Sequence, residues 1–100
     1  MLFCEILELA TKPSEDLRQR HIEYLKRQGT RGNLVLAGRF SDVSGGLLVW
    51  NVSAIKRAEQ LARNDPYVTS KIATFVLKNW LLSFNYTSSL PTAPASALNL

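Results

Sequence analysis

The chain contains 100 residues, of which 46% are hydrophobic and 20% are charged, and its formal net charge is +4. This length predicts a single domain, and this composition predicts a folded chain rather than a disordered one. The single cysteine, Cys4, excludes an intramolecular disulfide and a metal site built from several cysteines.

The first apolar segment, residues 2–10, predicts a β-strand on which Cys4 is a small buried residue. Glu5 and Glu8 interrupt the segment and no basic leader precedes it, so it is typical of neither a signal peptide nor a membrane span. We therefore expect the protein to reside in the cytoplasm without a membrane partner.

The next segment predicts a helix that begins after Ser14 as N-cap, with Glu15 and Asp16 in its first turn. The helix is expected to end at about Gln28, with Gly29 as the residue that follows it.

The only histidine of the chain, His21, lies in this helix. Its spacing from Leu17, Tyr24 and Leu25 places it on the apolar face. Two interpretations stay open: a core or interface histidine whose hydrogen bonds are satisfied, or a working group in a pocket.

The middle of the chain predicts two strands and a second helix. Residues 33–42 and 45–52 alternate as strands do, and the sequence SDVSGG between them is typical of a turn. Ser53 is a candidate N-cap for the second helix, whose expected buried face comprises Ala54, Ile55, Ala58, Leu61 and Ala62. The sequence NDP ends it.

The last strand is expected over residues 72–86, with a break near Asn79. We expect residues 1–86 to form the domain. Residues 87–100, rich in Ser, Pro and Ala, are expected to form a tail that is flexible or packs on a partner.

The order β-α-β-β-α-β predicts an α+β, ferredoxin-like fold with a four-stranded antiparallel sheet and two helices on one face. The third and fourth strands are apolar on both faces. Because an open apolar sheet face is unfavourable in water, we expect two sheets to pack face to face in a homodimer. Trp50 and Trp80 are expected in the core of that dimer.

Several short motifs occur together in an order that resembles the YCII-related (YciI-like) family over roughly residues 1–82. The motifs are Arg18-x-x-His21, Ala37-Gly38, Gly45-Gly46, Asp65-Pro66-Tyr67 and Lys78-x-Trp80. The resemblance implies a dimeric α+β barrel with His21 near Asp65 in a pocket. Relatives in the wider superfamily include lactone isomerases and enzymes that remove chloride from ring compounds.

The chain departs from the family at two positions. Arg39 stands where the family usually has proline, and Lys71 stands where it often has glycine. Both cations can line the pocket and favour an anionic ligand, or they can mark a pocket whose activity is lost.

A histidine held by a carboxylate is a competent acid or base near neutral pH. His21 and Asp65 are thus the candidate catalytic pair, although Asp65 can equally serve the turn after the second helix. The candidate substrate-binding residues are Arg18, Arg39, Asp42, Tyr67 and Lys71, with a solvated charge as the alternative for Arg18 and a turn role for Asp42.

The functional hypothesis is acid/base chemistry, of an isomerase, lyase or dehalogenase type, on a small anionic carbonyl or phenolic compound. The alternative is a non-catalytic ligand-binding or accessory dimer. No cofactor or metal is expected. The basic residues are scattered and the base-stacking motif of RNA-recognition domains is missing, so no nucleic-acid partner is expected.

Overall fold

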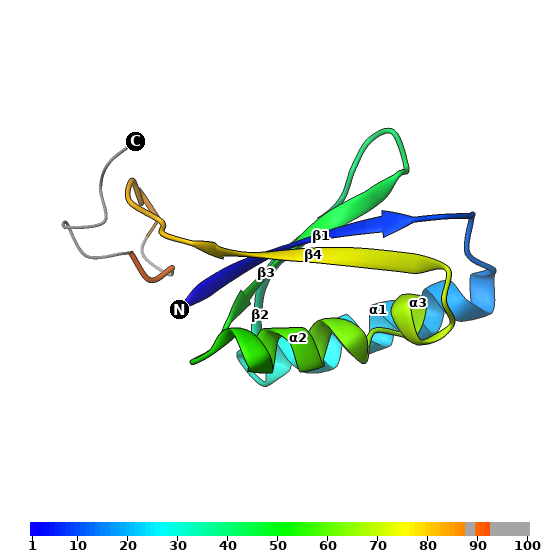
Figure 1. Ribbon diagram of the computed structural model, residues 1–100, viewed down its shortest axis with the longest axis horizontal. Helices are drawn as coiled ribbons and strands as arrows, with labels where there is room; N and C mark the ends of the chain where they lie inside the picture. The colour runs from blue at the N-terminus through cyan, green and yellow to red at the C-terminus, as the bar shows by residue number, and fades with distance from the viewer. Residues whose placement is uncertain (88–89, 93–100) are drawn as a thin grey trace.

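The computed structural model describes residues 1–87 and 90–92 (Figure 1). Its elements are β1 (Leu2–Leu9), α1 (Glu15–Thr30), β2 (Leu34–Arg39), β3 (Gly45–Asn51), α2 (Ile55–Arg63), α3 (Pro66–Thr69) and β4 (Ala73–Trp80). The strands form one antiparallel sheet in the order β2-β3-β1-β4. The predicted α+β, ferredoxin-like fold is confirmed.

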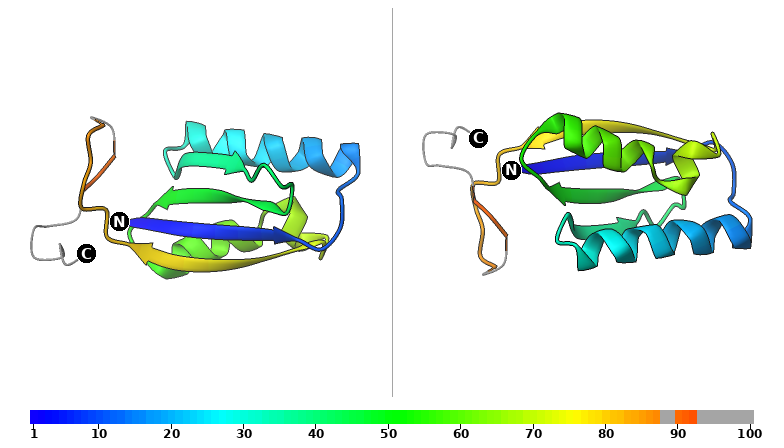
Figure 2. Two further views of the ribbon diagram at one scale, coloured as in Figure 1. Left: turned by 90° about the horizontal axis from the view of Figure 1, so that it is seen from above. Right: turned by 90° about the horizontal axis from the view of Figure 1, so that it is seen from below.

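The helices cover one face of the sheet and leave most of the other open (Figure 2). α1 contacts β2, whereas α2 contacts β1 and β4. The core lies between the sheet and these helices. Its largest buried side chains include Phe3, Leu7, Leu48, Trp50, Leu61 and Tyr67.

The start of α1 is as predicted, but its end is not. The Ser14 side chain accepts a hydrogen bond from the Leu17 N–H at 3.2 Å, which satisfies a free donor of the first turn. The helix continues through Gly29 to Thr30, two residues past the predicted end at about Gln28, so Gly29 lies inside the helix rather than after it. One helical glycine costs only about 1 kcal/mol, and the left-handed backbone falls at Gly32 instead.

Ser53 does not cap α2. The N-cap is Ala54, whose carbonyl accepts the first helical hydrogen bond, from the Ala58 N–H, and no side chain caps this end. Ala58, Leu61 and Ala62 are buried as predicted, whereas Ile55 is exposed. The pattern of apolar residues leaves the start of a short helix uncertain by one residue, and the surrounding turn decides it.

β4 ends at Trp80, six residues before the predicted limit. Trp80 pairs with Leu2 at the start of β1, so residues beyond Trp80 have no strand to pair with. Leu82 instead packs on Leu2 and Val49 at the end of the open face. Most of the predicted tail, residues 88–89 and 93–100, lies outside the described residues.

The open face carries a row of exposed apolar side chains. Its members are Ile6, Leu36, Leu47, Val76 and Trp80, each between 38% and 55% exposed. Trp50 lies on the other face and is fully buried within the protomer, so its predicted place in a dimer core is wrong. Alternation showed that Trp50 and Leu47 lie on opposite faces, but only the packing of the helices decides which face is covered.

Candidate functional site

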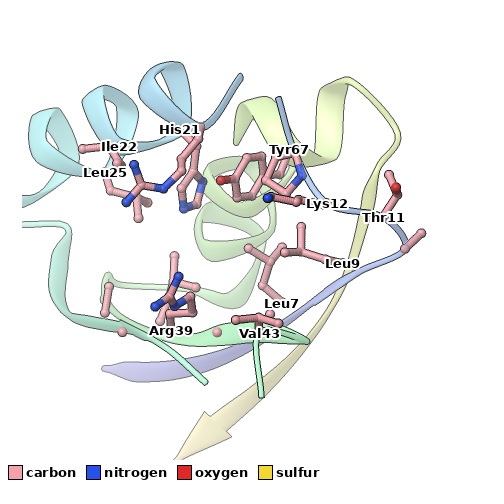
Figure 3. Close-up of a pocket in the computed structure, with 18 of the residues that line it drawn as sticks. Leu7, Leu9, Thr11, Lys12, His21, Ile22, Leu25, Arg39, Val43 and Tyr67 are labelled. Atoms are coloured by element: carbon pink, nitrogen blue, oxygen red, sulfur yellow. The ribbon is translucent and has the colours of Figure 1, made fainter. Parts of the chain in front are cut away.

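A pocket of about 920 Å³ lies between α1 and the sheet, beside the C-terminal end of β1 (Figure 3). Its apolar lining includes Leu7, Leu9, Ile22, Leu25, Val43 and Leu48. Polar groups enter it from several elements: Lys12 from the loop before α1; Glu15, Arg18 and His21 from α1; and Arg39 from β2, so that cations outnumber the one carboxylate. This combination suits a small ligand with an apolar body and a negative charge.

His21 is held on two sides. Its Nδ1 lies 2.7 Å from Oδ1 of Asp65, and its ring stacks on the Tyr67 ring with centroids 3.9 Å apart and planes 8° apart. Only 13% of the His21 side chain is exposed. These contacts leave the ring a single orientation at the wall of the pocket.

Asp65 owes its position to α3, which the sequence did not predict. It is the N-cap of that helix, with Pro66 in the first turn, and its Oδ1 also accepts the Tyr67 N–H at 2.9 Å. Asp-Pro is typical of a helix start as well as of a turn, and this signal was missed. Asp65 therefore caps α3 and contacts His21 at the same time.

The hydrogen bond that Asp65 accepts selects the tautomer of His21. A carboxylate accepts a hydrogen from Nδ1, which makes Nε2 the basic nitrogen of the neutral ring. The aspartate also stabilises a positive charge on the ring once Nε2 takes up a proton. The pair can thus accept and return a proton at one atom.

The other predicted binding residues divide into two groups. Arg18, Arg39 and Tyr67 line the pocket, with the two arginines on α1 and β2. Arg18 also lies 3.6 Å from Glu15 in an exposed ion pair, which contributes little to stability. Asp42 and Lys71 are not among the lining residues.

Asp42 and Lys71 both belong to turns. The Asp42 carboxylate accepts hydrogen bonds from the hydroxyl and backbone N–H of Ser44, at 2.6 and 3.0 Å, and these bonds lower its pKa. Lys71 is exposed and has a φ of +66°, a conformation that glycine adopts most easily. The glycine that the resemblance implies for this position would fit this backbone without strain.

Glu5 is a buried acid that sequence reasoning passed over. It is fully buried on the helix-covered face of β1, where the Trp50 Nε1–H donates to its Oε1 at 2.9 Å. The pKa of Glu5 is raised to about 7 in total: burial is the largest cause, the Trp50 hydrogen bond opposes it, and the negative charge of Asp65 adds a smaller upward shift. Its place between Phe3 and Leu7 in the alternation was the available signal.

A second buried polar group, the hydroxyl of Tyr24, donates a hydrogen bond to the Leu61 carbonyl at 2.6 Å. Burial, together with the charges of Asp65 and Glu5, raises the pKa of Tyr24 to about 12. Tyr24 stays a neutral donor at ordinary pH and ties α1 to α2.

The family model for the YCII-related domain matches residues 1–80. The chain belongs to the YCII-related family. The uncharacterized protein YjpA of Bacillus subtilis (strain 168) is 30% identical over 78 residues, which span 74% of this chain and 92% of that protein.

Two solved structures share the fold of this family member. The 5-chloro-2-hydroxyhydroquinone dehydrochlorinase TftG of Burkholderia phenoliruptrix AC1100, in complex with 2,5-dihydroxybenzoquinone, is 16% identical with a TM-score of 0.63. The match covers 83% of this chain and 96% of TftG. Muconolactone isomerase is 12% identical with a TM-score of 0.71, and the match covers 92% and 99% of the two chains.

Within residues 1–87 and 90–92, no three His, Cys, Asp or Glu side chains gather as ligands for a metal ion. None of the helices in this part of the chain is long and apolar enough to cross a membrane.

Proposed function

We propose that this YCII-related protein performs acid/base chemistry on a small anionic carbonyl or phenolic compound, with His21 as the proton-transferring group. The observation that carries the proposal is the 2.7 Å contact between His21 and Asp65 at the wall of the 920 Å³ pocket. General acid/base catalysis by a positioned side chain typically contributes 10²–10⁴-fold to a rate.

In the proposed mechanism, Nε2 of His21 removes a proton beside a carbonyl or from a phenolic hydroxyl. Asp65 stabilises the charged ring, and stacking on Tyr67 keeps the ring in place. Arg18 and Arg39 bind the anionic group, and the Tyr67 hydroxyl donates a hydrogen bond to the substrate. Asp42 and Lys71 lie outside the pocket lining, so we leave them out of the proposed site.

The chemistry named for the two structural neighbours supports this reaction class. TftG is a dehydrochlorinase and the second neighbour is a lactone isomerase. Loss of hydrogen chloride and isomerisation of a lactone both require proton transfer, which one acid/base group can supply. Chlorinated hydroxyhydroquinones and unsaturated lactones are therefore the first substrates to test.

The experiment compares His21→Ala with Arg20→Ala on a panel of these compounds. Arg20 is exposed on the same helix and pairs with Asp16, outside the pocket. We expect His21→Ala to lower kcat/KM by roughly 10²–10⁴-fold and Arg20→Ala to change it little. A folded His21→Ala protein with unchanged activity contradicts acid/base catalysis by His21.

The alternative function is non-catalytic ligand binding. One observation favours it: His21 is mostly buried, hydrogen bonded and stacked, as a structural histidine would be. Calorimetry on the same panel separates the two functions. Binding without turnover, unchanged in His21→Ala, supports the binding protein.

We also propose a homodimer formed through the open sheet face, because the exposed row from Ile6 to Trp80 needs a cover. The free thiol of Cys4 agrees with a reducing compartment, so the cytoplasm is the proposed location.

A further inference from the structure

Two buried carboxylates lie in the core beneath the pocket. Glu5 on β1 and Asp65 at the start of α3 are both 0% exposed. Each has one bonded oxygen, while Glu5 Oε2 and Asp65 Oδ2 have no hydrogen-bond partner within the described residues. A buried charged oxygen without a partner is costly, and two neighbouring carboxylates favour a state in which one of them is protonated.

The hydrogen bonds decide which of the two is protonated. Asp65 Oδ1 accepts from the Tyr67 N–H and contacts Nδ1 of His21, whereas Glu5 Oε1 accepts only from the neutral indole of Trp50. Because hydrogen bonds to the charged form favour that form, the negative charge belongs on Asp65 and the proton on Glu5. The raised pKa of Glu5, which the charge of Asp65 raises further, agrees with this assignment.

No cation among the described residues compensates a charge on Glu5. The charged group that acts on Glu5 is Asp65 at the start of α3, and both carboxylates act on Tyr24 of α1. β3 contributes Trp50, while β4 places Leu77 directly opposite Glu5. Arg27 and Arg57 act on Tyr24 and Arg18 acts on Tyr67, all three from exposed positions.

We propose that Glu5 is a positioning residue that holds a proton beneath the His21–Asp65 pair and thereby controls how strongly His21 retains its own proton. While Glu5 is neutral, Asp65 is the only negative charge beside the imidazole. When Glu5 releases its proton to water, a second buried negative charge favours the protonated ring. The consequence for catalysis rests on the proposed function, whereas the coupling itself is a property of the folded protein.

The first test is an NMR titration of the full-length wild-type protein carrying ¹³C in its glutamate carboxyl groups. We expect the Glu5 carboxyl carbon to titrate at about pH 7. The exposed Glu8, on the same strand, provides the reference signal in the same spectrum. The proposal is overturned if Glu5 titrates together with Glu8, and this measurement needs no variant.

The second test follows His21, the only histidine, through its single Cε1–H resonance. In wild-type protein this resonance should inflect at the pH at which Glu5 ionises. Glu5→Gln keeps an acceptor for Trp50 but has no ionisable group. Protonation of the ring itself still gives an inflection, but its midpoint should move to lower pH, whereas in the matched control Glu8→Gln it should stay at the wild-type pH. The same midpoint in Glu5→Gln and in wild type contradicts the coupling.

These outcomes are distinct from those of the activity test. If His21→Ala retains activity while Glu5 titrates at about pH 7 and the His21 inflection depends on Glu5, the coupling stands and the catalytic proposal fails. If His21→Ala is inactive while Glu5 titrates as Glu8 does, catalysis by His21 stands and the role of Glu5 fails.

Discussion

At the scale of single residues, one carboxylate oxygen of Asp65 makes two contacts with different consequences. Oδ1 caps α3 through the Tyr67 N–H and contacts Nδ1 of His21. The local geometry of the helix start therefore positions the candidate proton-transferring group. Glu5 adds a second carboxyl to the same core, and the unfavourable burial of its charge makes folding sensitive to pH.

The stability of the protein should depend on the ionisation of Glu5. Its pKa is raised from 4.5 to about 7 in the folded chain, so the folded state binds the proton more tightly than the unfolded state. This contribution to stability is present below pH 4.5 and is lost as the pH rises to about 7. A shift of this size corresponds to roughly 3 kcal/mol.

Denaturant unfolding at a series of pH values checks this expectation. The free energy of unfolding of Glu5→Gln, relative to wild type, should rise by roughly 3 kcal/mol across that interval. Glu8→Gln, at an exposed position, should show no such rise. A difference between Glu5→Gln and wild type that is independent of pH contradicts a buried, proton-holding Glu5.

At the scale of secondary-structure elements, the segment after β4 does not continue the strand but packs on the open face of the sheet. The pairing of β4 with β1 reaches Leu2, the first residue of β1, which lies opposite Trp80. The chain leaves the sheet after β4 (Figure 1). Leu82 packs on Leu2 and Val49 at one end of the open face. This contact makes residues past the family domain part of the folded unit.

Substitution of Leu82 tests this contact. Leu82→Ala removes a side chain that is 9% exposed and should lower the free energy of unfolding by about 2–3 kcal/mol. The neighbouring Leu81 is 51% exposed, so Leu81→Ala should change stability by less than about 0.5 kcal/mol. Equal effects of the two substitutions in thermal or denaturant unfolding would contradict packing by Leu82.

At the scale of the whole molecule, the two faces of the sheet differ in what covers them. The helices bury one face and the pocket opens between α1 and that same face. The other face exposes an apolar row that Leu82 covers only at one end. The proposed dimer interface and the proposed active site therefore lie on opposite sides of the sheet.

A second positive charge in the middle of the open face should prevent the proposed dimer from forming. Lys78 already lies on this face, two residues along β4, and Val76→Lys would bury another ammonium beside it between the two sheets. Light scattering should give twice 11.2 kDa for wild type and 11.2 kDa for Val76→Lys. Gln60→Lys adds the same charge on α2 and should remain dimeric; a monomeric wild type at micromolar concentration would contradict the interface.

The sequence by itself determined the kind and order of the main elements, the N-cap Ser14 and the candidate residues His21 and Asp65. These features depend on local periodicity, on caps and on short motifs, all of which are present within a few neighbouring residues. Both faces of the strands could be read as well, because side chains in a strand alternate strictly.

Only the tertiary structure decided which sheet face the helices cover, where β4 ends and what lies around Glu5. Each of these depends on segments distant in the chain: Leu2 limits β4, while Trp50 and Asp65 set the environment of Glu5. The sequence alone does not show whether a carboxyl group on a strand faces water or the core. Burial beside a second carboxylate turns Glu5 into a proton-holding group, and only the folded chain brings the two together.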